Sequence, residues 1–409
     1  MRGQRIAVCL LVAVVACISA SCATGKLVGE KIEHVAKGGS VDSSGLNDAF
    51  KNDTRTMETN LEQLRRKFAQ AVTQLRGNVS RYWGQHDTRV AERTVYVKYT
   101  QGYRSRVITD FDHGVVSIET LDEKDPTGSL RSAIIAALLT SNDPSTVDLF
   151  SDKDVVLEPS RQPYLYGLVH DEHGHSIRTR RQAEQFADYL LTQKVHTRTL
   201  KDEGGKTAHY VRLSMVHNYE TKSAERYRPS VEKYASEYHV SPSLVFAIIR
   251  TESNFNPFAV SGAPAYGLMQ LVPTSGGRAA YRRVQGVDEA PNADYLFDPE
   301  HNIELGTAYL GILSNEEFRA VSDASSRDYC VIAAYNTGPR NVTRTFSADH
   351  NAAIQDINGM PPEALYQRLR TDLPFQETRD YVVKVSTHRR EFASPASPVP
   401  AIAIDAALH

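Results

Sequence analysis

Residues 241–257, SPSLVFAIIRTESNFNP, place an acidic side chain on the apolar face of a predicted helix. The serine and proline that open the stretch suit an N-cap and a first helical position, because proline lacks only an N–H that would be unpaired there. Leu244, Ile248 and Glu252 follow at intervals of four, on one stripe of a 3.6-residue helix. The pattern therefore predicts a helix whose Glu252 faces the core.

Burial would give Glu252 an unusual acidity. Desolvation favours the protonated form of a carboxyl group, and the nearby C-terminal end of the helix further disfavours a negative charge. A carboxylic acid that stays protonated near neutral pH can donate a proton to a substrate. The alternative is a last-turn glutamate that rotates into solvent, and this helix alone does not decide between the two.

The composition is that of an ordinary folded protein with more than one core. The chain has 409 residues, enough for two or three domains, and 41% of them are hydrophobic. Its 47 basic and 49 acidic residues leave a net charge of −2, so no global field favours nucleic acid or a membrane surface.

The N-terminus has the features of an export signal. Arg2 and Arg5 precede an uncharged, mostly apolar run over 6–18, followed by the small residues 19–21 and then Cys22. This run is shorter than the roughly 20 residues that a membrane-spanning helix needs. The ending on cysteine resembles a bacterial lipoprotein signal, which predicts that Cys22 is lipidated and anchors the chain in the outer membrane, facing the periplasm.

Two alternatives to this anchor remain open, namely lipidation at Cys17 and secretion without any lipid. We expect a signal peptide over 1–21 and a polar tether over 22–45. Cys330 is then the only thiol left besides the lipidated residue, which excludes an intramolecular disulfide. Its apolar surroundings predict a buried, inert side chain.

Residues 46–218 are predicted to form an α+β domain with an antiparallel sheet. Apolar alternation and turn signals indicate strands, and helical spacing indicates helices. We expect strands at 94–99, 106–111, 115–119, 163–169 and 208–216, and helices at 50–75, 130–139 and 181–194.

Residues 219–393 read as a mostly helical second domain, with the boundary between 218 and 225. Several amphipathic helices follow one another there, including those at 327–336 and 377–390. The tail at 394–409, rich in Pro and Ala, is expected to be disordered. The predicted fold class is therefore α+β, with an antiparallel-sheet domain followed by a helical one.

Two further motifs follow Glu252 along the chain. Residues 263–270, APAYGLMQ, combine small residues with a glycine that permits close backbone approach and a glutamine that both donates and accepts hydrogen bonds. Residues 333–339, AAYNTGP, place an aromatic hydroxyl and an amide at the C-terminal end of a helix. Such groups suit a sugar, whose hydroxyls need paired hydrogen bonds.

Taken together, the ESNFNP, GLMQ and AYNTG motifs resemble the lytic transglycosylases, which cleave peptidoglycan with a goose-lysozyme-like domain. Three motifs in the same order over about 90 residues make this resemblance specific. Membrane-bound members of that family are similar to this chain in three further segments, namely the lipoprotein-like start, the sequence VYVKYT at 95–100 and the sequence DPSTVDL at 143–149. Tyr266 and Thr337 depart from the family pattern and leave the detailed shape of the cleft open.

The resemblance implies a role for individual residues. Glu252 matches the single catalytic acid, which protonates the glycosidic oxygen between N-acetylmuramic acid and N-acetylglucosamine. It then takes the proton of the muramic C6 hydroxyl, closing a 1,6-anhydro ring without water. The implied substrate-binding positions are Ser261, Gly267, Met269, Gln270, Tyr335, Asn336 and, less specifically, Glu377.

The residues beside Glu252 agree with a single-acid reaction. Ordinary glycosidases use two carboxylates, yet residues 253–287 contain no Asp or Glu. A lysozyme-type hydrolase and a non-catalytic wall-binding lipoprotein remain as alternatives. We expect peptidoglycan strands as the partner, with no nucleic acid, no metal and no cofactor. The histidine-rich text at 170–175 is interpreted as a solvated loop.

Overall fold

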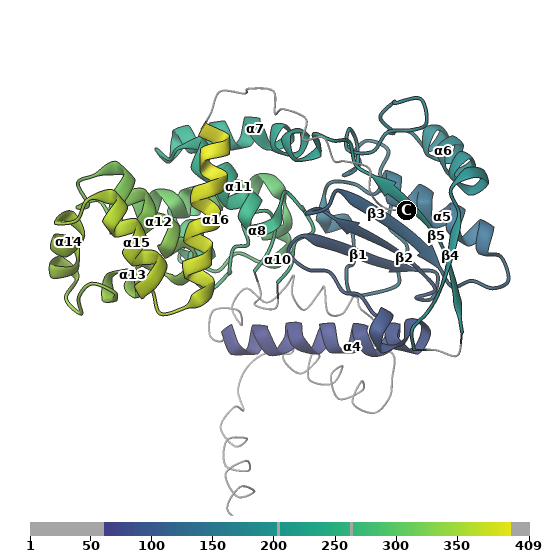
Figure 1. The fold of residues 1–409 in the computed structure, drawn as a ribbon, viewed down its shortest axis with the longest axis horizontal. Coiled ribbons are helices and arrows are strands. Elements are labelled where there is room, and N and C mark those ends of the chain that lie inside the picture. The colour runs from purple at the N-terminus through teal and green to yellow at the C-terminus, as the bar shows by residue number, and fades with distance from the viewer. Residues whose placement is uncertain (1–60, 203–204, 262–264, 394–409) are drawn as a thin grey trace, which may run out of the picture. The chain divides into compact units, whose positions relative to one another are not determined.

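The computed structural model describes residues 61–202, 205–261 and 265–393 (Figure 1). The predicted signal peptide, Cys22, the tether and the C-terminal tail lie outside these residues, as do residues 50–60 of the first predicted helix. Within the described ranges, no helix is both long enough and apolar enough to cross a membrane.

The first half of the described chain contains a five-stranded antiparallel sheet with strand order β1-β2-β3-β5-β4. Its strands are β1 (Val95–Thr100), β2 (Ser105–Asp110), β3 (Val115–Thr120), β4 (His196–Thr199) and β5 (Thr207–Ser214). The predicted α+β class with an antiparallel sheet is confirmed.

Two details of the sheet differ from expectation. Strand β4 was not predicted, because its sequence HTRT is polar and largely exposed at the sheet edge, where no apolar alternation is required. The predicted strand at 163–169 is wrong. There the backbone turns, with Leu168 N–H and Val169 N–H both donating to the Leu165 carbonyl, and its apolar side chains fill the core from a turn.

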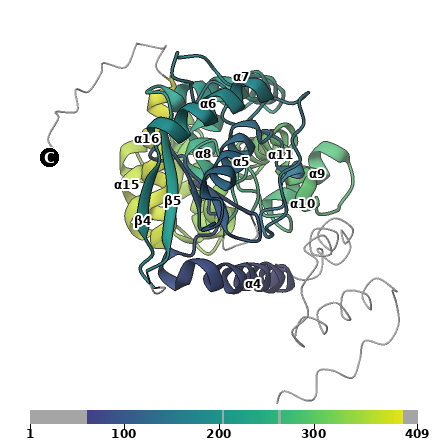
Figure 2. The same ribbon diagram turned by 90° about the vertical axis from the view of Figure 1, so that its right-hand side faces the viewer.

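Helices cover both faces of the sheet (Figures 1 and 2). On one face, Val97 and Tyr99 of β1 pack with residues of helix α4 (Leu61–Asp87), which extends beyond the predicted end at residue 75. On the other, Tyr96 packs in a core formed with α5 (Pro126–Leu139) and α6 (Arg180–Gln193). Alternate side chains of a strand point to opposite faces, so β1 serves both cores.

The second half is helical, as predicted. It begins with α7 (Tyr219–Glu237) and continues with α8 (Pro242–Ser253). The following elements are α9 (Gly276–Gln285), α10 (Ala293–Phe297), α11 (Pro299–Ile312), the π-helical turn η2 (Leu313–Glu317), α12 (Ala324–Thr337), α13 (Pro339–Arg344), α14 (His350–Asn358), α15 (Pro362–Asp372) and α16 (Gln376–Ala393).

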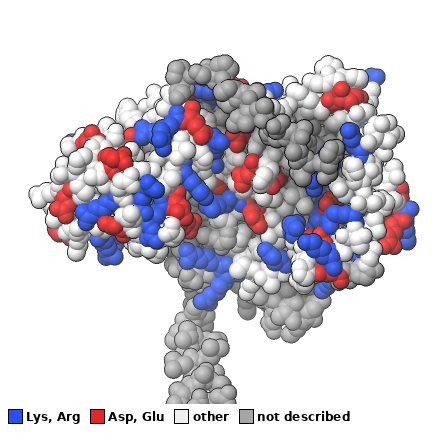
Figure 3. Space-filling view, viewed as in Figure 1, with Lys and Arg blue, Asp and Glu red and all other residues white. Residues whose placement is uncertain are grey.

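Helix α8 lies inside this helical bundle and carries Glu252. Its residues 244–249 are all buried, and α16 packs against both α8 and α12 (Figure 1). Cys330 on α12 is fully buried, and burial raises the pKa of its thiol to about 12, which agrees with the expected inert thiol. Basic and acidic side chains are interspersed on the face shown in Figure 3, as the nearly balanced composition predicts.

Candidate functional site

Glu252 is buried in the last turn of α8. The residue is only 6% exposed, and Leu244 and Ile248 of the same stripe are buried with it. The alternative in which this glutamate rotates into solvent is therefore not the conformation observed. Ser241 occupies the predicted N-cap position before Pro242, although its side chain makes no capping hydrogen bond.

Two side chains from distant parts of the chain contact the Glu252 carboxyl group. The Tyr381 hydroxyl of α16 donates a hydrogen bond of 2.7 Å to Oε1. The Arg93 guanidinium, just before β1, lies with Nη1 3.8 Å from Oε2. The acid is thus held between the helical domain and a segment of the sheet domain.

Burial raises the pKa of Glu252 to about 7. The hydrogen bond from Tyr381 and the charge of Arg93 lower this pKa and partly offset the burial, while the negative charge of Glu377 raises it. At neutral pH the protonated and ionised forms are therefore similarly populated. A group poised in this way can give up a proton in one step and accept one in the next.

The backbone turns sharply after the acid. Asn254 and Phe255 both have left-handed φ values, of 45° and 63°. Asn254 Nδ2 donates to the Phe111 carbonyl at 2.7 Å, and Asn256 Nδ2 donates to the Arg93 carbonyl at 3.0 Å. Asparagine tolerates the left-handed region and supplies these donors, so the ESNFNP motif links the end of α8 to the sheet domain.

The GLMQ motif forms a tight loop beside the acid. Gly267 has φ +73°, and a Cβ there would lie 2.5 Å from Asn302 Nδ2. The Asn302 Oδ1 accepts the Met269 N–H at 2.7 Å, which holds the loop against α11. Only glycine combines this backbone conformation with so close a neighbour.

Met269 and Gln270 do different things within this loop. The Met269 side chain is fully buried in the helical core, and the Met269 carbonyl accepts a 2.9 Å hydrogen bond from the Tyr335 hydroxyl. Gln270 Nε2 donates to the carbonyls of Ala259 and Gly267, while its buried Oε1 has no partner among the described residues. In this conformation Met269 packs the loop, whereas Gln270 retains a free acceptor.

Asn336 and Glu377 lie where α12 meets the start of α16. Asn336 Oδ1 accepts a 2.6 Å hydrogen bond from Thr378 Oγ1. Glu377 is exposed in the first turn of α16, and its charge acts on Glu252 without a direct contact. Tyr381 follows Glu377 by four residues, so the two belong to one face of α16.

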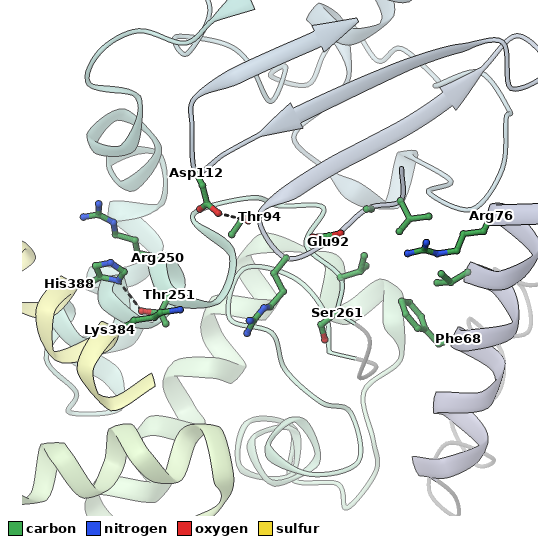
Figure 4. A pocket seen from close by; sticks show the side chains of 15 residues that line it. Phe68, Arg76, Glu92, Thr94, Asp112, Arg250, Thr251, Ser261, Lys384 and His388 are labelled. Carbon is green, nitrogen blue, oxygen red and sulfur yellow. Dashed lines mark hydrogen bonds between the residues drawn. The ribbon is translucent and has the colours of Figure 1, made fainter. Parts of the chain in front are cut away.

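Ser261 lines a pocket of about 660 Å³ next to the acid (Figure 4). Its walls are formed by helices α4, α8 and α16 and by residues 90–94. The lining includes Thr251, which precedes Glu252 in α8, and Arg93, which is the ion-pair partner of Glu252. Figure 4 shows Lys384 and His388 at one end and Phe68 and Arg76 at the other. The pocket therefore runs from α8 and α16 to α4, and Glu252 itself is not among its lining residues.

Tyr381 and Arg93 were not predicted as site residues. The sequence contains an indication for Tyr381, because this residue follows the predicted site residue Glu377 by one helical turn in the segment ETRDYV. Arg93 carries no such signal, because an arginine before a strand is ordinarily solvated. Among the residues that the structure describes, no three His, Cys, Asp or Glu side chains are grouped so as to hold a metal ion, and 170–175 forms an exposed turn.

Comparison with known proteins gives two family matches. Residues 57–226 match the membrane-bound lytic murein transglycosylase C N-terminal domain, and residues 229–358 match the transglycosylase SLT domain. Two solved structures are similar in part. A Slt lytic transglycosylase mutant from Pseudomonas aeruginosa is 28% identical with a TM-score of 0.30, covering 41% of this chain and 25% of that one. The 70 kDa soluble lytic transglycosylase of Escherichia coli is 27% identical with a TM-score of 0.31, covering 41% and 24%.

Curated relatives match over most of their length. The membrane-bound lytic murein transglycosylase C of Sodalis glossinidius is 43% identical over 315 residues, which cover 77% of this chain and 87% of the relative. The protein of the same name from Serratia proteamaculans is 40% identical over 353 residues, covering 86% and 95%. The chain therefore belongs to the membrane-bound lytic murein transglycosylase C family.

Proposed function

We propose that this protein is a peptidoglycan lytic transglycosylase that uses Glu252 as its single acid and base. It cleaves the β-1,4 bond between N-acetylmuramic acid and N-acetylglucosamine and leaves a 1,6-anhydro-muramic end, in turnover and remodelling of the cell wall. The observation that carries the proposal is one buried carboxyl group with a pKa of about 7, placed beside a pocket within the family's domain.

The chemistry proceeds in two proton transfers. Protonated Glu252 donates its proton to the glycosidic oxygen as the bond from that oxygen to the muramic C1 breaks. The resulting carboxylate then removes the proton of the muramic C6 hydroxyl while that oxygen bonds to C1. Glu252 ends the cycle protonated, and no water is consumed.

Among the described residues, Glu377 is the one carboxylate whose charge acts on Glu252, and Glu92 and Asp112 line the neighbouring pocket. Residues 253–287 carry no Asp or Glu, and Glu377 is exposed at the start of α16. We propose that Glu377, together with Ser261, Gln270 and Asn336, contacts the glycan, and that Gly267, Met269 and Tyr335 shape the loop that receives it. The unpartnered Oε1 of Gln270 supports such a contact, because a buried acceptor without a partner is costly unless a ligand supplies a donor.

Digestion of purified sacculi with mass spectrometry of the products tests the proposal. We expect the wild-type protein to release anhydro-muropeptides, which are lighter than hydrolytic products by one water. Glu252→Gln should abolish release while sedimentation with sacculi persists. The exposed Glu289→Gln is the matched control and should behave as wild type.

Other outcomes identify the alternatives. Reducing muramic ends would indicate a lysozyme-type hydrolase, with Glu377→Gln then expected to be as inactive as Glu252→Gln. Wild-type protein that binds sacculi but releases nothing would indicate a wall-binding lipoprotein.

We also propose that Cys22 carries the lipid that anchors the protein to the outer membrane, facing the periplasm. The support is the lipoprotein-like start together with the membrane-bound family. Labelling with palmitate, followed by membrane fractionation, tests this: Cys22→Ser should lose the label. Loss of label in Cys17→Ser instead would assign the anchor to that cysteine.

A further inference from the structure

The loop that follows the catalytic helix is built into the core of the sheet domain. Phe258, fully buried, packs against Tyr96 of β1 with ring centroids 4.4 Å apart and against Tyr164 at 5.3 Å. Asn254 and Asn256 add hydrogen bonds to the carbonyls of Phe111 and Arg93. These contacts attach the residues that follow α8 to the sheet domain.

Arg93 is placed by the same contacts. Its carbonyl accepts the hydrogen bond from Asn256, which is fully buried, so the backbone of the segment before β1 is held next to α8. Its guanidinium then reaches back to the acid, with Nη1 3.8 Å from Glu252 Oε2. Among the described residues, no other carboxylate lies within ion-pair distance of Arg93.

The other groups that face the acid are not cations. From α16, Tyr381 donates its hydrogen bond to Oε1 and Glu377 adds a negative charge. From α12, the partly buried Tyr335 has a pKa raised by desolvation and also by the charge of Glu252. Among the described residues, Arg93 is the one positively charged side chain that acts on Glu252, and the sheet domain supplies it.

We propose that Arg93 is a positioning residue, supplied by the N-terminal domain, that stabilises the Glu252 carboxylate formed between the two proton transfers. This inference rests on the proposed function of Glu252. It makes the N-terminal domain an electrostatic part of the active site, in addition to any role in binding or anchoring. The acid strength of Glu252 then depends on the seating of the two domains through Asn254, Asn256 and Phe258.

The sign of the effect follows from the charge. A guanidinium beside a carboxylate favours the ionised form, so Arg93 lowers the pKa of Glu252. The Arg93 side chain is 45% exposed, and water screens it. At this separation, such a screened attraction corresponds to a pKa shift of about one unit.

The test replaces Arg93 by methionine, which keeps the backbone carbonyl that Asn256 needs. Because the protonated acid starts the reaction, activity falls as pH rises through the pKa of Glu252. In Arg93→Met we expect the alkaline limb of the kcat/KM profile to shift to higher pH by about one unit. We also expect kcat at pH 5 to fall by up to about tenfold, while KM changes little. Arg93→Lys should restore the wild-type limb.

Arg76→Met is the matched control, because Arg76 is an exposed cation that lines the same pocket from α4 and does not contact Glu252. The alkaline limb of its pH profile should fall at the same pH as in the wild-type protein, whatever happens to KM. An identical alkaline limb in Arg93→Met and Arg76→Met would overturn the proposal.

A direct titration separates this inference from the proposed function. The Glu252 carboxyl band, assigned in isotope-edited infrared spectra by its loss in Glu252→Gln, reports its ionisation without substrate. We expect the midpoint to rise by about one pH unit in Arg93→Met and to stay unchanged in Arg76→Met. An unchanged midpoint in Arg93→Met overturns the role of Arg93. Absence of anhydro products from wild-type protein overturns the proposed function while leaving this titration valid.

Discussion

Replacement of Glu252 by glutamine is expected to make the protein more stable at neutral and alkaline pH. Glutamine keeps the shape of the side chain and removes its ionisation. In the wild-type protein, burial raises the pKa of Glu252 from 4.5 to about 7. The unfolded chain therefore ionises at a lower pH than the folded protein does.

The size of the effect follows from the difference between the two pKa values. Below pH 4.5 the group is protonated in both states and costs nothing. Between pH 4.5 and 7 only the unfolded state ionises, so the wild-type protein loses about 1.4 kcal/mol per pH unit, or about 3 kcal/mol in total. Above pH 7 both states are ionised and the difference becomes constant. Because Glu252 is only 6% exposed, water screening does not reduce the figure substantially.

Chemical denaturation of the two proteins from pH 4 to pH 8 measures this directly. The free energy of unfolding of Glu252→Gln minus that of wild type should rise by about 3 kcal/mol between pH 4.5 and 7 and then level off. In thermal melts, about 3 kcal/mol corresponds to a shift of about 3 to 4 °C for a chain of this size. The contributions of the other titrating groups cancel in this difference, because both proteins contain the same groups.

A difference that stays constant with pH would refute the reasoning, because it would mean that Glu252 titrates as an ordinary exposed glutamate. A difference that falls as pH rises would refute it more strongly, since it would require a pKa below 4.5 in the folded state. The exposed Glu289→Gln serves as the control and should show no such pH dependence.

Three further substitutions test separate parts of the structure. In Tyr381→Phe the hydrogen bond to Glu252 Oε1 is lost. Because this bond is stronger to the ionised carboxylate than to the protonated acid, its loss should raise the pKa of Glu252 by about one unit. The alkaline limb of the pH profile should then lie at higher pH. Gly267→Ala forces a left-handed φ and a clash with Asn302, so urea denaturation should show a loss of about 3 kcal/mol; unchanged stability would mean that the loop relaxes freely. In the wild-type protein, burial lowers the pKa of Lys98 to about 8. The folded state therefore loses this proton at a lower pH than the unfolded state, and the free energy of unfolding should rise between pH 8 and 10.5. Lys98→Met should lack that rise.

Much of the fold follows from local patterns. Strands β1, β2 and β3 match the predicted runs to within one residue at either end, because each alternates apolar and polar side chains next to a clear turn signal. Helix α8 also appears as predicted, with Glu252 on its buried stripe. The two exceptions have local causes. Strand β4 is short, polar and at an edge, and the apolar run at 163–169 fills the core without extending.

The site divides in the same way. Local sequence patterns place an acid on the apolar face of a helix and show that no other Asp or Glu follows it for 35 residues, from 253 to 287. Helical periodicity and local composition are properties of neighbouring residues, so both can be recognised in the amino-acid sequence. The family motifs could be recognised for the same reason, because each is a short contiguous segment.

The groups that surround this acid come together through the folding of distant segments. Tyr381 is 129 positions away from Glu252 along the chain, and Arg93 belongs to the other domain, yet both reach the same carboxyl group. Their approach depends on how α16 packs on α8 and on how Phe258 enters the core of the sheet domain. The pKa of the acid is set by burial and by these long-range contacts, and neither is encoded in the spacing of nearby residues.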